Sequence, residues 1–266
     1  MRTVVLLRGG HEEDHEREAA QRAGFTVIRQ RAAVQPGDFV VPRYSALPFF
    51  KEFENDVKLL GGTLINTYRE HQFCADMREW STALGDLTPK TWFRLQDARD
   101  AKGPFVLKGA TNSMKFLWDT HMYAETFEDA VRVHSRLTAD SLVGEQDIYI
   151  REYVPLLTHC RSDRGLPITR EYRSFFYKTT ELTTGYYWST HGEDVPPEWI
   201  TSRPPPEFLA SVVEIIARHV TFFAIDVAQK QDGGWIVVEV NDGQQSGLSM
   251  NKALDLYVPL WEEVLT

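Results

Sequence analysis

Cysteine, the residue that forms disulfides and often binds zinc, is scarce in this chain of 266 residues. Its two cysteines, Cys74 and Cys160, have no metal-type spacing, and its eight histidines form no zinc-binding arrangement such as HExxH. Because disulfides are rare in reducing compartments, this scarcity of cysteine predicts a cytoplasmic protein.

Other signals are missing as well. No apolar run approaches the ~20 residues that a membrane-spanning helix needs, and the run at Thr3–Leu7 is too short for a signal peptide and lacks a cleavage site. The net charge is −9, so the chain lacks the basic footprint of a nucleic-acid-binding protein. Neither GxGxxG nor GxSxG occurs, which argues against a dinucleotide fingerprint and a hydrolase nucleophile. We therefore expect neither a membrane nor nucleic acid as a partner.

The first third of the chain alternates between strand and helix signals. Thr3–Leu7 is a continuous apolar run, which predicts a buried parallel strand. A helix is expected over His11–Ala23, ended by Gly24, and a second strand over Phe25–Arg29. This β-α-β order predicts a small Rossmann-like layer.

The remainder is richer in strand signals. Strands are predicted over Thr91–Leu95, Pro104–Leu107, Asp147–Val154, Glu171–Tyr177 and Thr183–Ser189, and helices over 126–137, Glu207–Val220 and from Lys252 to the end. Thr126 and Asp129 resemble a capping box at the start of the first of these helices. The proline-rich loop 192–206 is not expected to form regular structure, and its role cannot be read from the sequence.

The stretch Thr221–Leu248 predicts a hairpin. Two apolar runs flank Asp232-Gly233, a strong signal for a two-residue loop. With that loop, Asp226 lies directly opposite Glu239, and Asn241 shares the face of Glu239. The residues then expected to point into a core are Phe223, Ile225, Val227, Ile236, Val238 and Val240.

Opposed carboxylates repel each other at this short separation. A divalent cation would remove the repulsion, and Mg²⁺ prefers oxygen ligands of this type. The spacing also fits a solvated polar face, or two carboxyl groups that share one proton.

Four features follow one another in a defined order: a strand ending in Lys108 (FVLKGATNSMK), one with Arg151 (IYIREYVP), one with Arg173 (EYRSFF), and the acidic hairpin (AIDVA, VEVND). This order resembles the ATP-grasp superfamily, and more narrowly its clade marked by two arginines and a lysine, to which the cell-division-cycle translation-factor assembly protein also belongs. The resemblance covers about Pro89 to the end. It implies an α/β (α+β) fold: a Rossmann-like pre-ATP-grasp layer (1–88), an N-terminal lid subdomain (89–146) and a C-terminal subdomain with the metal site (147–266), the last two with antiparallel sheets.

The resemblance also implies roles for the matched residues. Arg173 would stabilise charge on the transferred phosphoryl group, with Arg151 as a second catalytic arginine. The residues implied in ATP binding are Lys108, Ser113, Lys115, Glu152, Tyr153 and Val154, the last three as the hinge around adenine. Those implied in Mg²⁺ binding are Asp226, Glu239 and Asn241.

The residues themselves leave alternatives open. Lys108 also fits an exposed lysine at a strand end, and Tyr153 fits an ordinary core aromatic. Arg173 also fits an internal ion pair with Glu171 or Glu152.

By resemblance, the chain is expected to be an ATP-dependent carboxylate–amine ligase that forms an acyl-phosphate from a small acid or peptide, with ATP and Mg²⁺ as cofactors. The substrate would enter between the N-terminal layer and the hairpin, near Gly243–Gly247. The alternative is an ATP-binding assembly or chaperone protein that acts on a protein partner with little turnover. Direct phosphoryl transfer to a small molecule is a third, weaker possibility.

Overall fold

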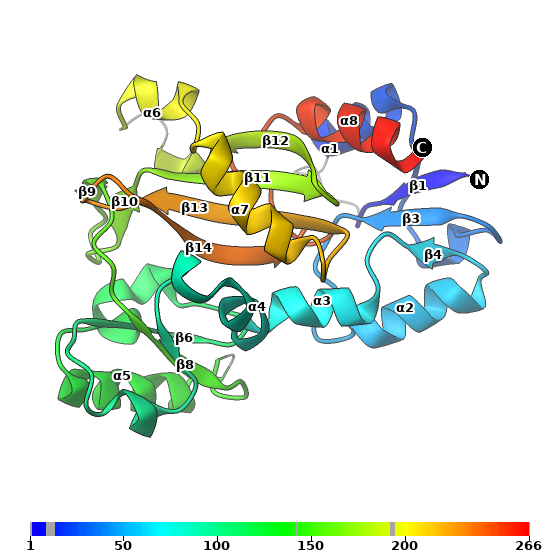
Figure 1. The fold of residues 1–266 in the computed structure, drawn as a ribbon. Coiled ribbons are helices and arrows are strands. Elements are labelled where there is room, and N and C mark those ends of the chain that lie inside the picture. The colour runs from blue at the N-terminus through cyan, green and yellow to red at the C-terminus, as the bar shows by residue number, and fades with distance from the viewer. Residues whose placement is uncertain (1, 9–13, 142, 192–194, 266) are drawn as a thin grey trace.

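The computed structural model describes residues 2–8, 14–141, 143–191 and 195–265. Within these ranges the strands form one parallel and two antiparallel four-stranded sheets, with a separate two-stranded hairpin (Figure 1). The predicted mixed α/β class, a parallel N-terminal sheet followed by antiparallel sheets, is therefore confirmed.

The parallel sheet has the order β2-β1-β3-β4 and is built from short strands. They are β1 (Thr3–Leu6), β2 (Thr26–Ile28), β3 (Phe39–Pro42) and β4 (Thr63–Leu64). Every residue of β1 is buried because helices cover both faces, and this explains its unbroken apolar run. α2 (Phe50–Leu59) covers one face. α1 (Asp14–Ala23) and the C-terminal α8 (Ala253–Leu265) cover the other. The predicted start of the first helix, at His11, lies outside the described residues.

The second sheet has the order β5-β8-β6-β7. Its strands are β5 (Thr91–Trp92), β6 (Phe105–Gly109), β7 (Tyr123–Ala124) and β8 (Ile148–Glu152). α5 (Phe127–Ala139) packs on one face, and the predicted capping box of Thr126 and Asp129 is present at its start. β8 lies in this sheet although it follows the boundary expected at residue 146. The division of the chain into domains stays a prediction.

The third sheet has the order β12-β11-β13-β14. Its strands are β11 (Glu171–Tyr177), β12 (Thr180–Tyr186), β13 (Phe222–Gln229) and β14 (Trp235–Asp242). One face packs against α3 (Tyr68–Ala75), α4 (Met77–Leu84) and α7 (Pro206–Ile216). The other face packs on α8 at one end only, through Phe175, Phe222 and Ala224. Its polar residues lie beyond that covered end.

The β13–β14 hairpin differs from the prediction at its turn. The amide of Lys230 donates to the Gly234 carbonyl at 2.7 Å and Gln229 pairs with Trp235, so the loop has three residues rather than two, and Gly233 adopts a φ of +92°. A bulge next to Asp226 then restores the register, and Asp226 lies opposite Glu239 as predicted. Two deviations therefore cancel at the carboxylates.

The bulge changes which apolar side chains of β14 are in the core. Val237 pairs with Val227 and is buried in the core, whereas Ile236 and Val238 line a pocket on the other face. The prediction that Ile236 and Val238 point into the core was wrong, because the extra residue shifts the alternation of side chains.

The proline-rich stretch was also misjudged. Residues 192–194 lie outside the described residues, but Pro197–Thr201 forms the short helix α6 with proline in its first turn. Proline is tolerated there because the first helical amides have no intrahelical partner. The separate hairpin is formed by β9 (Thr158–Arg161) and β10 (Pro167–Thr169). In the described part of the chain, no helix combines the length and apolar character required to cross a membrane.

Candidate active site

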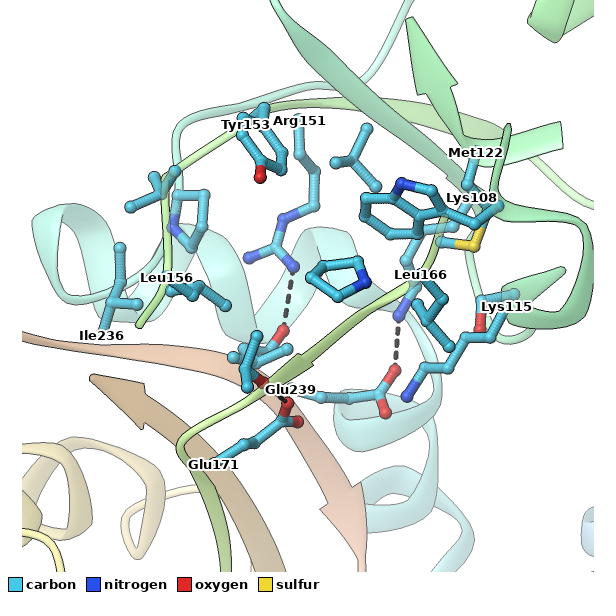
Figure 2. Close-up of a pocket in the computed structure, with 18 of the residues that line it drawn as sticks. Lys108, Lys115, Met122, Arg151, Tyr153, Leu156, Leu166, Glu171, Ile236 and Glu239 are labelled. Atoms are coloured by element: carbon cyan, nitrogen blue, oxygen red, sulfur yellow. Dashed lines mark hydrogen bonds and ion pairs between the residues drawn. The ribbon is translucent and has the colours of Figure 1, made fainter. Parts of the chain in front are cut away.

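A pocket lies between the second and third sheets (Figure 2). It is lined by all six residues predicted to bind nucleotide, and also by Arg151 and Glu239. An adjoining cavity is lined by Arg173, Asn241, Lys115 and Glu239. The structure thus brings the predicted residues of β6, β8, β11 and β14 to one place.

Much of the pocket wall is apolar. Val106, Met122, Leu156, Ile236 and Val238 contribute to its walls. A flat aromatic base would bury its faces between such side chains. The bulge in β14 turns two of these residues, Ile236 and Val238, toward the pocket. The same bulge therefore places Asp226 opposite Glu239 and forms part of the apolar wall.

The hinge after β8 has a limited set of backbone groups to offer. The amides of Glu152 and Tyr153 already donate to the carbonyls of Lys90 and Pro104, at 2.9 and 3.0 Å. The Val154 amide makes no backbone hydrogen bond within the described ranges. Of the three hinge amides, that of Val154 is therefore the one available to a ligand.

Lys108, at the end of β6, is not an exposed lysine. Its side chain is nearly buried and forms an ion pair with Glu239 across the pocket (Figure 2). Burial lowers the pKa of Lys108, and Glu239 partly opposes that effect. Burial alone would raise the pKa of Glu239, but Lys108 and Lys115 outweigh it and the pKa falls.

Arg173 does form an internal ion pair, but with neither of the expected partners. Its Nε and one terminal nitrogen donate to the two oxygens of Asp226 at 2.7 and 2.6 Å, because β11 and β13 are neighbours. Its other terminal nitrogen donates to the Gly247 carbonyl at 2.9 Å. This bidentate geometry fixes the guanidinium in the sheet face.

The three residues predicted to bind the metal lie together. The side-chain nitrogen of Asn241 is 3.3 Å from Asp226 Oδ2 and 3.5 Å from Glu239 Oε2. With its amide rotated, Asn241 would present an oxygen to the same point. Within the described ranges no three His, Cys, Asp or Glu side chains form a metal cluster. Their carboxylate and amide oxygens are donors of the kind that Mg²⁺ prefers, and the binding of Mg²⁺ by these residues stays a prediction.

A family model described as "ATP-grasp domain, R2K clade family 3" matches residues 95–264. The chain belongs to this ATP-grasp family. The predicted resemblance to the clade with two arginines and a lysine is thereby confirmed. No curated protein matches the chain.

Solved structures of ATP-grasp proteins match nearly the full length. The RimK domain protein ATP-grasp from Sphaerobacter thermophilus is 16% identical with a TM-score of 0.62, and the match covers 99% of this chain and 100% of that chain. D-cycloserine synthetase DcsG is 16% identical with a TM-score of 0.62, covering 98% and 99%. ATP-grasp ligase PsnB complexed with minimal precursor, Mg and ADP is 11% identical with a TM-score of 0.59, covering 98% and 97%. At such identities the likeness shows a shared ATP-grasp fold.

Arg151 is a buried cation of this ATP-grasp pocket that forms no ion pair with a described carboxylate. Its terminal nitrogens donate to the Val238 carbonyl at 2.9 Å and to Thr88 Oγ1 at 2.6 Å. Its Nε is buried without a partner, and no carboxylate pairs with it in the part of the chain that the structure describes. Burial lowers the pKa of Arg151 to about 10. An anion in the pocket would relieve this cost.

Lys115 lies on the loop that borders the pocket, in a 3-10 turn over Lys115–Leu117. Its ammonium group donates to the Tyr187 hydroxyl at 2.8 Å, and Arg173 also lies over the Tyr187 ring, at 5.0 Å. Tyr187 thus holds two cations beside Glu239. No pattern in the sequence singles out this tyrosine.

Glu171 is another pocket residue whose role the sequence reasoning missed, since it was considered only as a partner for Arg173. It accepts a hydrogen bond from Thr169 Oγ1 at 2.9 Å, and burial raises its pKa to about 7 (Figure 2). The sequence did contain a signal for this residue. Glu171 lies two residues before Arg173, so both side chains are on the same face of the strand.

Proposed function

We propose that this ATP-grasp protein is an Mg-ATP-dependent carboxylate–amine ligase that forms an acyl-phosphate from a small acid or a peptide. One observation carries the proposal. The largely apolar pocket and a second, polar cavity meet at Lys108 and Glu239, which line both. A base in the first and an acid in the second would bring a γ-phosphate and a carboxylate together at that junction.

The residues at the junction suit phosphoryl transfer. Lys108 and Lys115 bind phosphate oxygens, and Arg173 stabilises charge on the transferred group. Asp226, Glu239 and Asn241 would hold Mg²⁺, which neutralises phosphate charge and aligns the group for attack. Lys108 exchanges its ion pair with Glu239 for one with phosphate, so ligand binding leaves neither charge unpaired.

The reaction needs no covalent side-chain nucleophile. A carboxylate oxygen of the acid attacks the γ-phosphorus and ADP leaves. The amine then attacks the acyl carbon, an amide bond forms, and the bond from carbon to the phosphate oxygen breaks. The ATP-grasp ligase PsnB, solved in complex with minimal precursor, Mg and ADP, supports this ligand set.

The test is phosphate release with Mg·ATP across a panel of amino acids, peptides and polyamines. A ligase should release phosphate only when an acid is present, and product should form only when an amine is present as well. Tight binding of Mg·ATP with no response to any acid would refute the ligase and favour the assembly protein considered from the sequence.

A further inference from the structure

The polar cavity has a histidine in its wall. It shares Lys108 and Glu239 with the nucleotide pocket, and His71 of α3 and Gln245 of the loop after β14 also line it. A group held beside phosphates at Lys108 and Glu239 would therefore lie in the same cavity as His71. The ring is almost completely buried, with 3% of the residue exposed.

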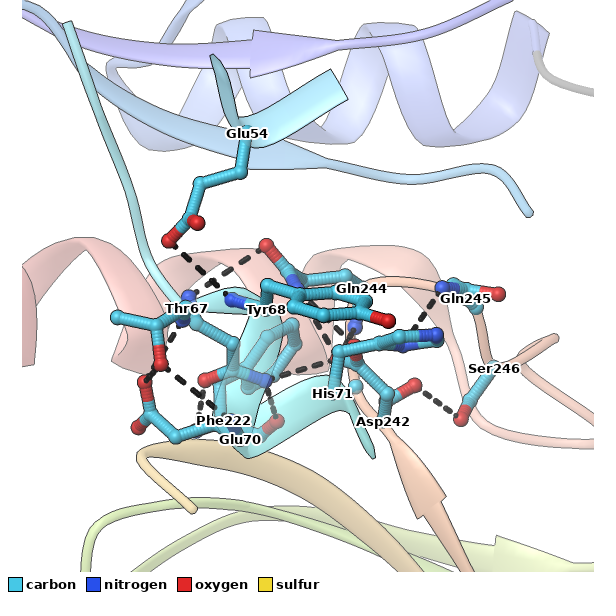
Figure 3. Close-up of polar contacts among 12 residues, drawn as sticks. Glu54, Thr67, Tyr68, Glu70, His71, Phe222, Asp242, Gln244, Gln245 and Ser246 are labelled. Carbon is cyan, nitrogen blue, oxygen red and sulfur yellow. Dashed lines mark hydrogen bonds and ion pairs between the residues drawn. The ribbon is translucent and has the colours of Figure 1, made fainter. Parts of the chain in front are cut away.

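Asp242 fixes which ring nitrogen carries the proton. Its Oδ2 is 3.0 Å from His71 Nδ1. Its Oδ1 accepts a hydrogen bond from Asn66 Nδ2 at 2.8 Å and another from the backbone N–H of Gln244 at 2.9 Å (Figure 3). A carboxylate that receives these donors is an acceptor, so His71 Nδ1 is the donor. The nitrogen left to accept a proton is Nε2.

The remaining contacts hold the ring in place and leave Nε2 unused. The ring stacks on Phe50 with centroids 4.1 Å apart and planes 7° apart. Nε2 makes no hydrogen bond to any residue that the structure describes. Gln245 Nε2 is also 3.0 Å from Nδ1, but two donors cannot share this contact. The Gln245 amide therefore presents its oxygen there.

Building on the ligase function proposed above, we propose that His71, held by Asp242, is the general base that activates the amine acceptor in this cavity. As the amine nitrogen forms its bond to the acyl carbon, it loses a proton to His71 Nε2 and phosphate leaves with the electrons of the broken C–O bond. The imidazolium is stabilised by Asp242 and returns its proton to solvent. An oriented histidine–carboxylate pair is suited to this task.

Two substitutions separate this role from a structural one. His71→Asn keeps a side-chain N–H near the position of Nδ1 for Asp242 and removes Nε2. His71→Gln places an amide near the position of Nε2 but cannot act as a base. The matched control is His219→Asn, because His219 also stacks on an aromatic ring, Phe73, with centroids 4.4 Å apart, but is exposed and does not line the cavity.

The assay compares two nucleophiles with the same acyl-phosphate. Hydroxylamine is weakly basic and attacks without a general base, so hydroxamate formation reports the first step. Amide formation with the amines of the panel reports the second. In His71→Asn we expect hydroxamate formation within a few-fold of wild type and amide formation lowered about 100-fold or more, the typical contribution of general base catalysis. The Mg·ATP-induced thermal shift should persist.

If His71→Asn changes amide formation and hydroxamate formation by the same factor relative to wild type, the role of His71 is overturned while the ligase function stands. A parallel loss of both activities in His71→Asn and His71→Gln, with a lower melting temperature, would also overturn it, since it would assign His71 a structural role. If wild-type protein gives no hydroxamate with any acid of the panel, the ligase function itself fails, and with it this role of His71.

Discussion

Replacing Glu171 by glutamine should change how stability depends on pH. Glu171 is the first residue of β11, is buried in the wall of the pocket and accepts one side-chain hydrogen bond, from Thr169. Burial raises its pKa from 4.5 to about 7. Its carboxyl group therefore binds a proton more tightly in the folded chain than in the unfolded one.

The sign and size of the effect follow from that shift. Between about pH 4.5 and 7 the folded protein keeps this proton and the unfolded chain has lost it, so the free energy of unfolding falls as pH rises. Each pH unit is worth at most about 1.4 kcal/mol, so the whole interval contributes on the order of 3 kcal/mol. Above pH 7 both states are ionised and the difference becomes constant.

The measurement is urea denaturation of wild type and Glu171→Gln at intervals between pH 5 and 8. Wild-type stability relative to Glu171→Gln should decline by on the order of 2–3 kcal/mol over this range. Glu152→Gln, which removes an exposed carboxylate from the same pocket, is the control. A difference between wild type and Glu171→Gln that does not vary with pH would refute the argument from burial.

Two further predictions concern the charged residues of the pocket. Asp226→Asn combined with Glu239→Gln should abolish the thermal stabilisation by Mg·ATP, because both carboxylates proposed to hold the metal are neutralised; a wild-type shift in differential scanning fluorimetry would exclude this metal assignment. Arg173→Ala should keep nucleotide binding but lose turnover, and should lower the free energy of unfolding by about 3–5 kcal/mol because Asp226 is left buried and unpaired. An unchanged rate of phosphate release would contradict the role of Arg173, and adding Asp226→Asn should restore part of the lost stability.

Periodicity was sufficient for the N-terminal layer and for the hairpin register, and the resemblance carried by the ordered motifs was sufficient for the antiparallel sheets and for the positions that meet at the pocket. Side chains alternate along a strand, so Asp226 and Glu239 could be set opposite each other from the sequence alone. The bulge that makes this register correct could not be seen, because Val237 and Val238 are the same residue type and nothing marks which of them is the extra one.

Partners that lie far apart in the sequence were beyond such reasoning. Arg173 pairs with Asp226 because β11 and β13 are neighbours in the sheet, and local pattern does not reveal which strands pair. His71 and Asp242 are 171 positions apart and meet only because α3 packs beside β14. Such contacts depend on how the layers pack, which the hydrophobic pattern of each element does not specify.

The packing of α1 on α8 has a consequence for how the chain is made. Val5 and Phe25 of the first elements share one core with Leu256 and Leu260 of the last helix. During synthesis the parallel sheet therefore leaves the ribosome with this face covered by α1 alone. The cover is complete only after α8 has emerged, so the N-terminal layer completes its fold after the hairpin of β13 and β14 has been made rather than as soon as its own strands are synthesised.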